Sequence, residues 1–195
     1  HVIETNQKYA DYKVCSLPLT SLAFSDEFFD SKRMQKILNQ INQVVQTEAP
    51  ISQTLLSKRI LTAWGITRLG VRLNDYLESL YTQLSLRYNH QNGTFFYWKQ
   101  EQNPELYKTF RIPMDETQKR NAEDLPREEV AAGVIEILTN QISLPEDDLI
   151  KETARLFGYA RIGTNVEQSM RLGIKYGLTK GLIAERDFRI ILPEK

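Results

Sequence analysis

The sequence predicts a mainly α-helical protein of the α+β class, in which a unit of three helices and a small β-hairpin occurs twice. Three observations predict this: a segment that repeats without gaps, apolar residues at helical spacing around each copy, and strand-forming residues after each third helix. The chain has 195 residues, of which 41% are hydrophobic and 10% aromatic, so it can bury a core.

The repeat is the strongest of these observations. Residues 55–70 align with residues 148–163 at a constant offset of 93 positions. The identical positions include two glycines that bracket an arginine, namely Gly65 and Gly158, Arg68 and Arg161, and Gly70 and Gly163. Unrelated amphipathic helices would share leucines but not these three residues in register, so the alignment indicates a duplication.

Two helices open each copy. Apolar residues at helical spacing predict a first helix over about residues 31–47 and a counterpart that begins near Pro126. Short proline-containing links, EAPIS and ISLPE, then lead as extended chain into a second helix. The second helix ends at Gly65 or Gly158, where a left-handed C-terminal cap is expected.

A third helix and a hairpin close each copy. The third helix follows Gly70 or Gly163, and Thr164 and Glu167 have the spacing of a capping box. Strand-like residues come next, after the turn dipeptide Asn92-Gly93 in one copy and around a polar turn in the other. Three helices followed by a hairpin is the winged-helix arrangement, so we expect tandem winged-helix-like repeats.

The aromatic run at residues 95–98 has two interpretations. Its rings could stack on nucleic-acid bases, as aromatic side chains do in single-strand binders. Side chains alternate along a strand, however, so at least two of the four are expected in the core whatever the other two do, and packing in the core or in an interface is the preferred interpretation.

The repeats divide the chain into four expected parts. These are an N-terminal arm at residues 1–30, a first repeat at 31–98, a connector at 99–125 and a second repeat at 126–195. The arm carries too many apolar side chains to leave in water, so it should pack on the first repeat or on a partner. The connector is polar and mixed in charge, and we expect it to be exposed.

Composition excludes several classes of protein. With 25 basic against 25 acidic residues, the chain is not a histone-like polycation. The single cysteine, Cys15, and the two histidines allow neither an internal disulfide nor a zinc site. The sequence has no export signal and no apolar run of the roughly 20 residues that a membrane helix needs. We expect a reduced, cytoplasmic protein without membrane contact, and its start at His1 suggests a piece of a longer chain.

No catalytic constellation is recognisable. Acidic residues cluster at predicted helix starts, where they stabilise the helix dipole without any chemistry. His90 and Cys15 have no evident partner, and no phosphate-binding loop of the GxxxxGK[ST] type occurs. The sequence therefore predicts neither an enzyme, nor a cofactor, nor a metal within these residues.

Basic residues of the second repeat are the candidates for nucleic-acid binding, because phosphate contacts dominate such affinity. The third helix of the first repeat has balanced charges, whereas that of the second, with its hairpin, is more basic. The candidate residues are Arg161, Arg171, Lys175, Lys180 and Arg186. The alternative is that this is an ordinary solvated helix face.

The bracketed arginines also have two interpretations. Each could contact a phosphate, or it could cap helix carbonyls or pair with a carboxylate of its own repeat. A structural role is the preferred interpretation for residues that a duplication retains. The residues expected to shape the two turns are Gly65, Arg68, Gly70, Gly158 and Gly163.

The chain resembles a known family from about Ile37 onward. The runs EAPISQTLLSKRILTAWGITRLGVRL, GTFFYW, REEVAAGVIEIL and LIKETARLFGYARIG are similar to an uncharacterised domain at the C-terminal end of large bacterial proteins. Those proteins resemble superfamily 1 helicases and often carry a nuclease-like segment. The resemblance implies that an ATPase motor lies upstream of this fragment, and it assigns no catalytic residue.

Two functions are therefore expected. The first is a non-catalytic accessory module of a helicase-like protein that engages nucleic acid, such as duplex DNA, through the second repeat. The second is a protein-protein interaction or scaffolding module that docks the helicase body or a second chain, which the neutral charge and the apolar arm favour.

Overall fold

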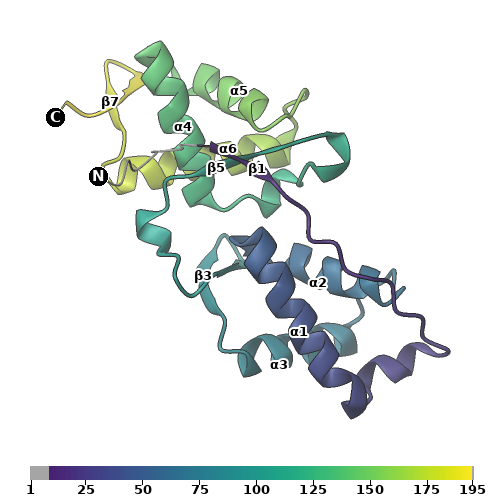
Figure 1. The fold of residues 1–195 in the computed structure, drawn as a ribbon. Helices are drawn as coiled ribbons and strands as arrows, with labels where there is room; N and C mark the ends of the chain where they lie inside the picture. Colours follow the sequence, from purple (N-terminus) through teal and green to yellow (C-terminus); the bar gives the residue numbers. More distant parts are fainter. Residues whose placement is uncertain (1–8, 195) are drawn as a thin grey trace, which may run out of the picture. The chain divides into compact units, whose positions relative to one another are not determined.

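The structure is a computed structural model that describes residues 9–194, an α+β fold with six α-helices and small sheets of two or three strands in that range (Figure 1). Two compact units make up the chain: residues 13–102 form the N-terminal unit, and residues 9–12 together with 103–194 form the C-terminal unit. The first eight residues of the predicted arm lie outside the described residues.

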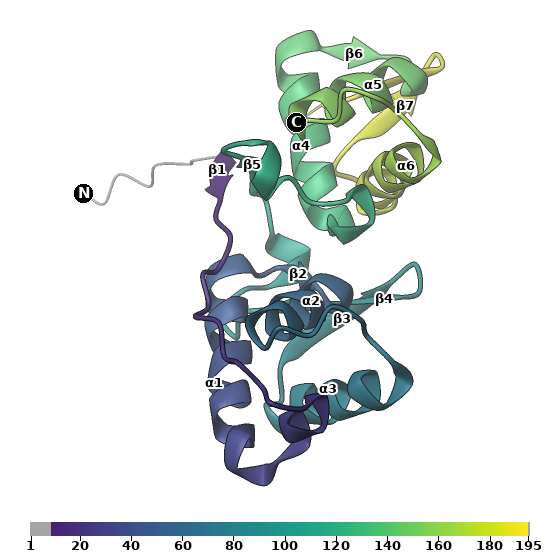
Figure 2. The same cartoon turned by 90° about the vertical axis from the view of Figure 1, so that its right-hand side faces the viewer.

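The N-terminal unit contains three helices and a three-stranded antiparallel sheet of order β2-β4-β3. Its elements are α1 (Ser31–Glu48), β2 (Ile51–Ser52), α2 (Gln53–Ala63), α3 (Val71–Gln83), β3 (Arg87–Gln91) and β4 (Thr94–Trp98). Side-chain caps start the first two helices: Asp30 accepts from the Lys32 amide at 2.9 Å, and Ser52 accepts from the Leu55 amide at 3.1 Å. Helix α2 packs on β2 and β4 (Figure 2).

The C-terminal unit has the same series of elements, with a sheet of order β6-β8-β7. They are α4 (Arg127–Gln141), β6 (Ser143–Leu144), α5 (Glu146–Leu156), α6 (Thr164–Thr179), β7 (Ala184–Arg186) and β8 (Arg189–Ile191). This unit also contains a parallel pair of strands, β1 (Tyr9–Tyr12) and β5 (Phe110–Pro113). Three-residue 3-10 turns follow β4 and β5, at Pro104–Leu106, Glu116–Gln118 and Ala122–Asp124.

Each unit encloses its own apolar cluster. Fully buried members in the N-terminal unit come from all three helices: Ile37, Ile41, Leu56, Ile60, Leu77 and Leu80. Their counterparts in the C-terminal unit are Val130, Val134, Leu149, Ala154, Met170 and Ile174. An aromatic residue at the end of the second helix is buried in each cluster: Trp64 in the N-terminal unit and Phe157 in the C-terminal unit. This matches their aligned positions in the repeat.

The turn between the second and third helices has the same backbone form in both units. Gly65 has φ +68° and Gly158 has φ +89°, so the predicted left-handed conformation is confirmed at both positions. Gly70 and Gly163 instead have ordinary negative φ values and immediately precede α3 and α6.

Two local predictions were wrong or incomplete. The links EAPIS and ISLPE are not only extended chain, because Ile51–Ser52 and Ser143–Leu144 each pair with a hairpin strand and turn it into a three-stranded sheet. The capping box at Thr164 does not form: Thr164 is already the first residue of α6, and Glu167 pairs with Arg171 instead.

The boundaries between the units differ from the predicted ones. The start of the arm contributes β1 to the C-terminal unit, and the connector contributes β5 and several buried residues instead of being wholly exposed. A buried ion cluster joins the connector to α4: the Glu129 carboxylate accepts from Arg111 at 2.9 Å and from Arg120 at 2.8 Å. Arg120 also lies 4.1 Å above the ring of Tyr12.

This cluster shifts the acidity of Glu129. Burial by itself would raise the pKa of Glu129, but the two guanidinium groups outweigh burial and lower that pKa below its ordinary value. The carboxylate therefore stays ionised at neutral pH and holds strand β5 to helix α4.

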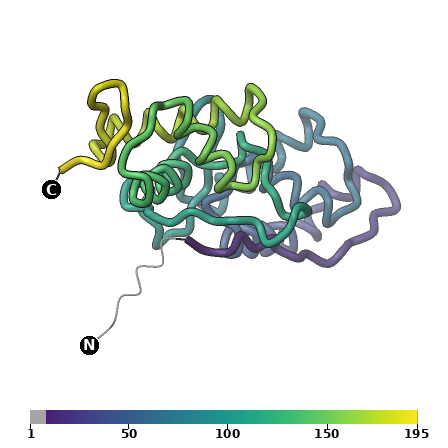
Figure 3. The backbone as a smooth tube through the Cα atoms, turned by 90° about the horizontal axis from the view of Figure 1, so that it is seen from above, coloured from purple at the N-terminus to yellow at the C-terminus, as the bar shows by residue number. Residues whose placement is uncertain are grey.

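The remainder of the arm, residues 13–30, packs along its own unit (Figure 3). The amide of Thr20 donates to the Ala63 carbonyl at 2.7 Å, and the amide of Cys15 donates to the buried Glu48 carboxylate at 3.0 Å. The ring of Phe28 is fully buried and meets Trp64 edge to face at 5.5 Å.

No helix in the described part of the chain is long and apolar enough to cross a membrane.

Candidate functional site

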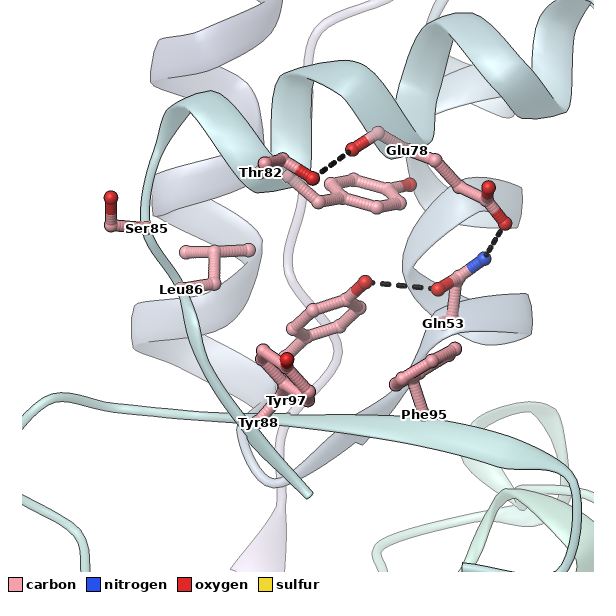
Figure 4. A pocket seen from close by; sticks show the side chains of 9 residues that line it. Gln53, Glu78, Thr82, Ser85, Leu86, Tyr88, Phe95 and Tyr97 are labelled. Atoms are coloured by element: carbon pink, nitrogen blue, oxygen red, sulfur yellow. Dashed lines mark hydrogen bonds between the residues drawn. The ribbon is translucent and has the colours of Figure 1, made fainter. Parts of the chain in front are cut away.

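The most distinctive hollow of the N-terminal unit is a cavity of about 270 Å³ between helix α3, the β3–β4 hairpin and the start of α2 (Figure 4). We call it the aromatic pocket, because four rings line it: Tyr81, Tyr88, Phe95 and Tyr97. Polar side chains from α2, α3 and the α3–β3 link complete it, namely Gln53, Glu78, Thr82 and Ser85.

The hairpin register brings three of the rings to one face. Tyr88 lies directly opposite Tyr97, and Phe95 precedes Tyr97 by two residues, so all three project from the same side of the sheet. The Tyr88 ring meets Phe95 at 5.6 Å and Tyr97 at 6.5 Å, in both cases edge to face. Tyr81 extends the series from α3 and meets Tyr97 at 5.2 Å.

The four rings differ in exposure. Tyr81 and Tyr97 are 2% and 6% exposed and form the inner wall, whereas Tyr88 is 61% and Phe95 38% exposed at the mouth. The expectation that at least two of positions 95–98 lie in the core is confirmed, because Phe96, Tyr97 and Trp98 are all buried. Both faces of this end of β4 are therefore covered.

A chain of hydrogen bonds fixes the polar side of the pocket. The Tyr97 hydroxyl donates to Gln53 Oε1 at 2.9 Å, and Gln53 Nε2 donates to Glu78 Oε1 at 2.7 Å (Figure 4). Asn74 Nδ2 donates to the same Glu78 oxygen at 3.0 Å. Because both described donors use Oε1, the second carboxylate oxygen of Glu78 is left for water or a ligand.

The phenols of the inner wall are neutral groups. Burial raises the pKa of Tyr81 well above its ordinary range, and burial together with the nearby Glu78 carboxylate does the same for Tyr97. Tyr81 further shares a 2.7 Å hydrogen bond with the Ser57 hydroxyl. Both rings therefore stay uncharged and fixed in position.

Charge determines which ligands the pocket can attract. Its only ionised lining side chain at neutral pH is the carboxylate of Glu78, since neither lysine nor arginine lines it. A phosphate or carboxylate ligand would meet repulsion here, whereas a cation would find an opposite charge and ring faces.

Three of the five basic residues predicted to bind nucleic acid are engaged in ion pairs. Arg171 reaches Glu146 at 2.9 Å, Asp147 at 3.2 Å and Glu167 at 2.9 Å. Lys180 pairs with Glu105 at 3.1 Å, and Arg186 pairs with Glu194 at 3.5 Å. These carboxylates offset much of the positive charge that phosphates would need.

The other predicted residues are more open. Arg161 and Lys175 are exposed, and the side chain of neither makes a hydrogen bond or ion pair with another described residue. The side chain of Arg68 is likewise exposed, and it makes no hydrogen bond or ion pair within residues 9–194. The structure therefore shows neither the carbonyl cap nor the carboxylate pair that we preferred for it. No interaction among the described residues links Arg161 to Lys175.

A second hollow, of about 570 Å³, lies beside the α2–α3 turn in the N-terminal unit. The apolar side chains that line it include Leu19 and Leu22 from the arm, Ile66 from the turn and Leu73 from α3. Arg68 also lines it. Leu19 is 72% exposed, so this part of the surface offers apolar contact area.

Sequence reasoning treated the aromatic run as core and did not identify the pocket. The available signal was the alternation that puts positions 88, 95 and 97 on one face of the hairpin. The missing information was that α3 would supply Glu78 and Tyr81 opposite that face, which depends on tertiary packing.

Comparison with known proteins adds one match. Residues 26–75, about a quarter of the chain, are similar to a family described as Protein of unknown function (DUF3320). The matched segment runs from the arm through α1 and α2 into α3, and it ends before Glu78. No curated protein and no solved structure matches the chain. The described residues also contain no group of His, Cys, Asp or Glu side chains placed to hold a metal ion.

Proposed function

We propose that the chain is a non-catalytic protein-binding module of a larger, helicase-like protein, and that its aromatic pocket receives a side chain of the partner. The observation that carries the proposal is the pocket itself: two rings held rigidly inside and two exposed at the mouth. Rigid aromatic rings that surround a small pocket are typical of the residues that dominate protein interfaces.

The fold supports a scaffolding role. In each unit a helix, a short strand, two helices and a hairpin follow one another, and the short strand pairs with the last strand of the hairpin. This order is consistent with the winged-helix-like units that the sequence predicts. A tandem of winged-helix-like units can hold binding surfaces without any reactive group. The helicase-like context rests on the sequence resemblance, and the apolar hollow near Leu19 provides a second contact area for a partner.

Nucleic-acid binding through the C-terminal unit is the second candidate. It is favoured by Arg161 and Lys175, which are exposed and unpaired among the described residues, and by Phe188, which is 91% exposed at the tip of the β7–β8 hairpin. Against it stands the ion pairing of Arg171, Lys180 and Arg186.

Selection from a random peptide library on the immobilised 195-residue chain tests the first candidate. Peptides recovered on the wild type should bind at least about tenfold more weakly to a Tyr88→Ala/Phe95→Ala variant, since hot-spot truncations cost that much or more. A Phe24→Ala variant is the matched control, because Phe24 is 75% exposed in the same unit and does not line the pocket. Failure to recover peptides, or equal binding to the pocket variant, would overturn the proposal.

The same chain can be titrated with a short fluorescent duplex at low and moderate salt to test the second candidate. We expect no salt-dependent binding. Binding that weakens with salt and is lost in an Arg161→Glu/Lys175→Glu variant would favour nucleic acid instead.

A further inference from the structure

We infer that the aromatic pocket binds the guanidinium group of an arginine side chain. The inference rests on the proposed protein-binding function for the source of that arginine, since a partner polypeptide would present it. It goes beyond that function by naming the chemical group that is recognised.

Ring faces and charge select a cation. Cations are attracted to the faces of tyrosine and phenylalanine rings, and four such rings surround this cavity. The only ionised lining group is Glu78, so no lining cation opposes a positively charged ligand. Tyr81 and Tyr97 cannot add negative charge at neutral pH because their phenols remain protonated.

The polar groups favour guanidinium over an alkylated ammonium. A guanidinium has five N–H donors in one plane and can stack on a ring while it donates at its edge. The lining side chains include acceptors for those donors: the second oxygen of Glu78 and the hydroxyl oxygen of Thr82. A quaternary ammonium has no donor and would leave these acceptors without a partner.

Size points to a side chain as the ligand. The cavity of about 270 Å³ lies at the lower limit of the roughly 300–1,000 Å³ that drug-sized ligands occupy. The two exposed rings, Tyr88 and Phe95, stand at the mouth where the aliphatic stem of an arginine would pass (Figure 4).

Titration of the isotope-labelled 195-residue chain with low millimolar methylguanidinium, at constant ionic strength, tests the inference by amide NMR shifts. Urea is the matched probe, because it has a similar shape and donors but no charge. Tetramethylammonium tests charge without donors. We expect saturable shifts in α3 and the β3–β4 hairpin with methylguanidinium, at least about fivefold weaker binding of tetramethylammonium, and no saturable response to urea.

Variants locate the binding. Glu78→Gln should weaken methylguanidinium binding about tenfold, as expected when a charge-assisted hydrogen bond becomes a neutral one. Asp75→Asn removes an exposed carboxylate from the same helix outside the pocket and should change nothing. Tyr88→Leu, at an exposed ring whose loss does not threaten the core, should also weaken binding.

The outcomes separate this inference from the proposed function. Equal binding of urea, tighter binding of tetramethylammonium, or no effect of both Glu78→Gln and Tyr88→Leu overturns the arginine assignment. Pocket-dependent peptides that lack a required arginine also overturn it while the protein-binding function stands. If methylguanidinium binds saturably but no peptide is selected, the assignment of the pocket as a guanidinium site stands and the proposed protein-binding function is overturned.

Discussion

Val130 occupies the space in which a side chain on Gly173 would have to begin. A Cβ atom on Gly173 would overlap Cβ and Cγ1 of Val130 and would lie 3.2 Å from the amide nitrogen of Ala131. Helices α4 and α6 therefore meet here through the backbone of Gly173 and the side chain of Val130 (Figure 1). The two helices can lie this close only because residue 173 has no Cβ atom.

Gly173→Ala should lower the free energy of unfolding of the C-terminal unit by about 1–3 kcal/mol, the usual cost of overfilling a packed core. Urea denaturation measures it. Gly163→Ala is the control in the same segment, because nothing lies within 4 Å of the position of its Cβ and its φ is negative. A Gly173→Ala protein as stable as the control would contradict this account of the helix contact.

Gly65 and Gly70 should respond differently to the same change, although they bracket one turn. Gly65 has φ +68°, which a residue with a Cβ adopts at a cost of roughly 1–2 kcal/mol. Gly70 has φ −93°, and neither position is crowded. We expect Gly65→Ala to lower the melting temperature more than Gly70→Ala, which costs only the lower preference of alanine for the N-cap position of α3. Equal effects would rule out the backbone explanation.

Glu129 should make the C-terminal unit sensitive to acid. Because its pKa is lowered on folding, its contribution to stability is complete above the ordinary carboxyl value of 4.5 and is lost as the pH falls towards about 2. In Glu129→Gln the two guanidinium groups remain buried without their counter-charge, which should cost about 3–5 kcal/mol at neutral pH.

Denaturation of both proteins between pH 7 and pH 2 tests this. The difference in unfolding free energy between wild type and Glu129→Gln should shrink below pH 4.5, because the wild type then loses the same charge. Glu123→Gln, at an exposed carboxylate of the same unit, serves as the control. A difference that stays constant with pH would show that the loss comes from packing and not from charge.

The carboxylates around Arg171 should suppress binding of nucleic acid. Changing Glu146→Gln, Asp147→Asn and Glu167→Gln together releases Arg171 next to Lys175. We expect salt-dependent binding of a short duplex to appear in this variant at low salt, at least about tenfold tighter than any binding of the wild type. Fluorescence anisotropy measures both quantities.

A triple variant with the same change in net charge provides the comparison: Asp75→Asn, Glu101→Gln and Glu116→Gln, all at exposed positions outside α5 and α6. If this comparison variant gains as much affinity as the first, the effect comes from total charge. The idea that the carboxylates around Arg171 suppress binding locally is then refuted.

Local signals in the sequence predicted the order of the helices and hairpins in both units. The aligned glycines at positions 65 and 158 predicted a left-handed turn because that conformation is a property of a single residue. By contrast, β2 and β6 have only two residues each, too few to show any periodicity, and they exist only because a hairpin strand lies beside them.

Contacts between distant residues account for what was missed. Tyr12 and Arg111 lie in strands separated by almost a hundred residues, and neither segment carries a pattern that reveals the other. The same applies to Glu78 and Tyr97, which come together only when α3 and the hairpin pack around Gln53. Basic residues were counted correctly, but the count could not show that Arg171 already had three acidic partners.

The contribution of residues 9–12 to the C-terminal unit means that this unit is discontinuous in the chain, with the whole N-terminal unit inserted between its first strand and the rest. A fragment truncated to begin at residue 103 would lose the ring beneath Arg120 and one strand of a two-stranded sheet. Any graft or fusion that is to keep this unit whole must therefore preserve both junctions, after Tyr12 and before Asn103.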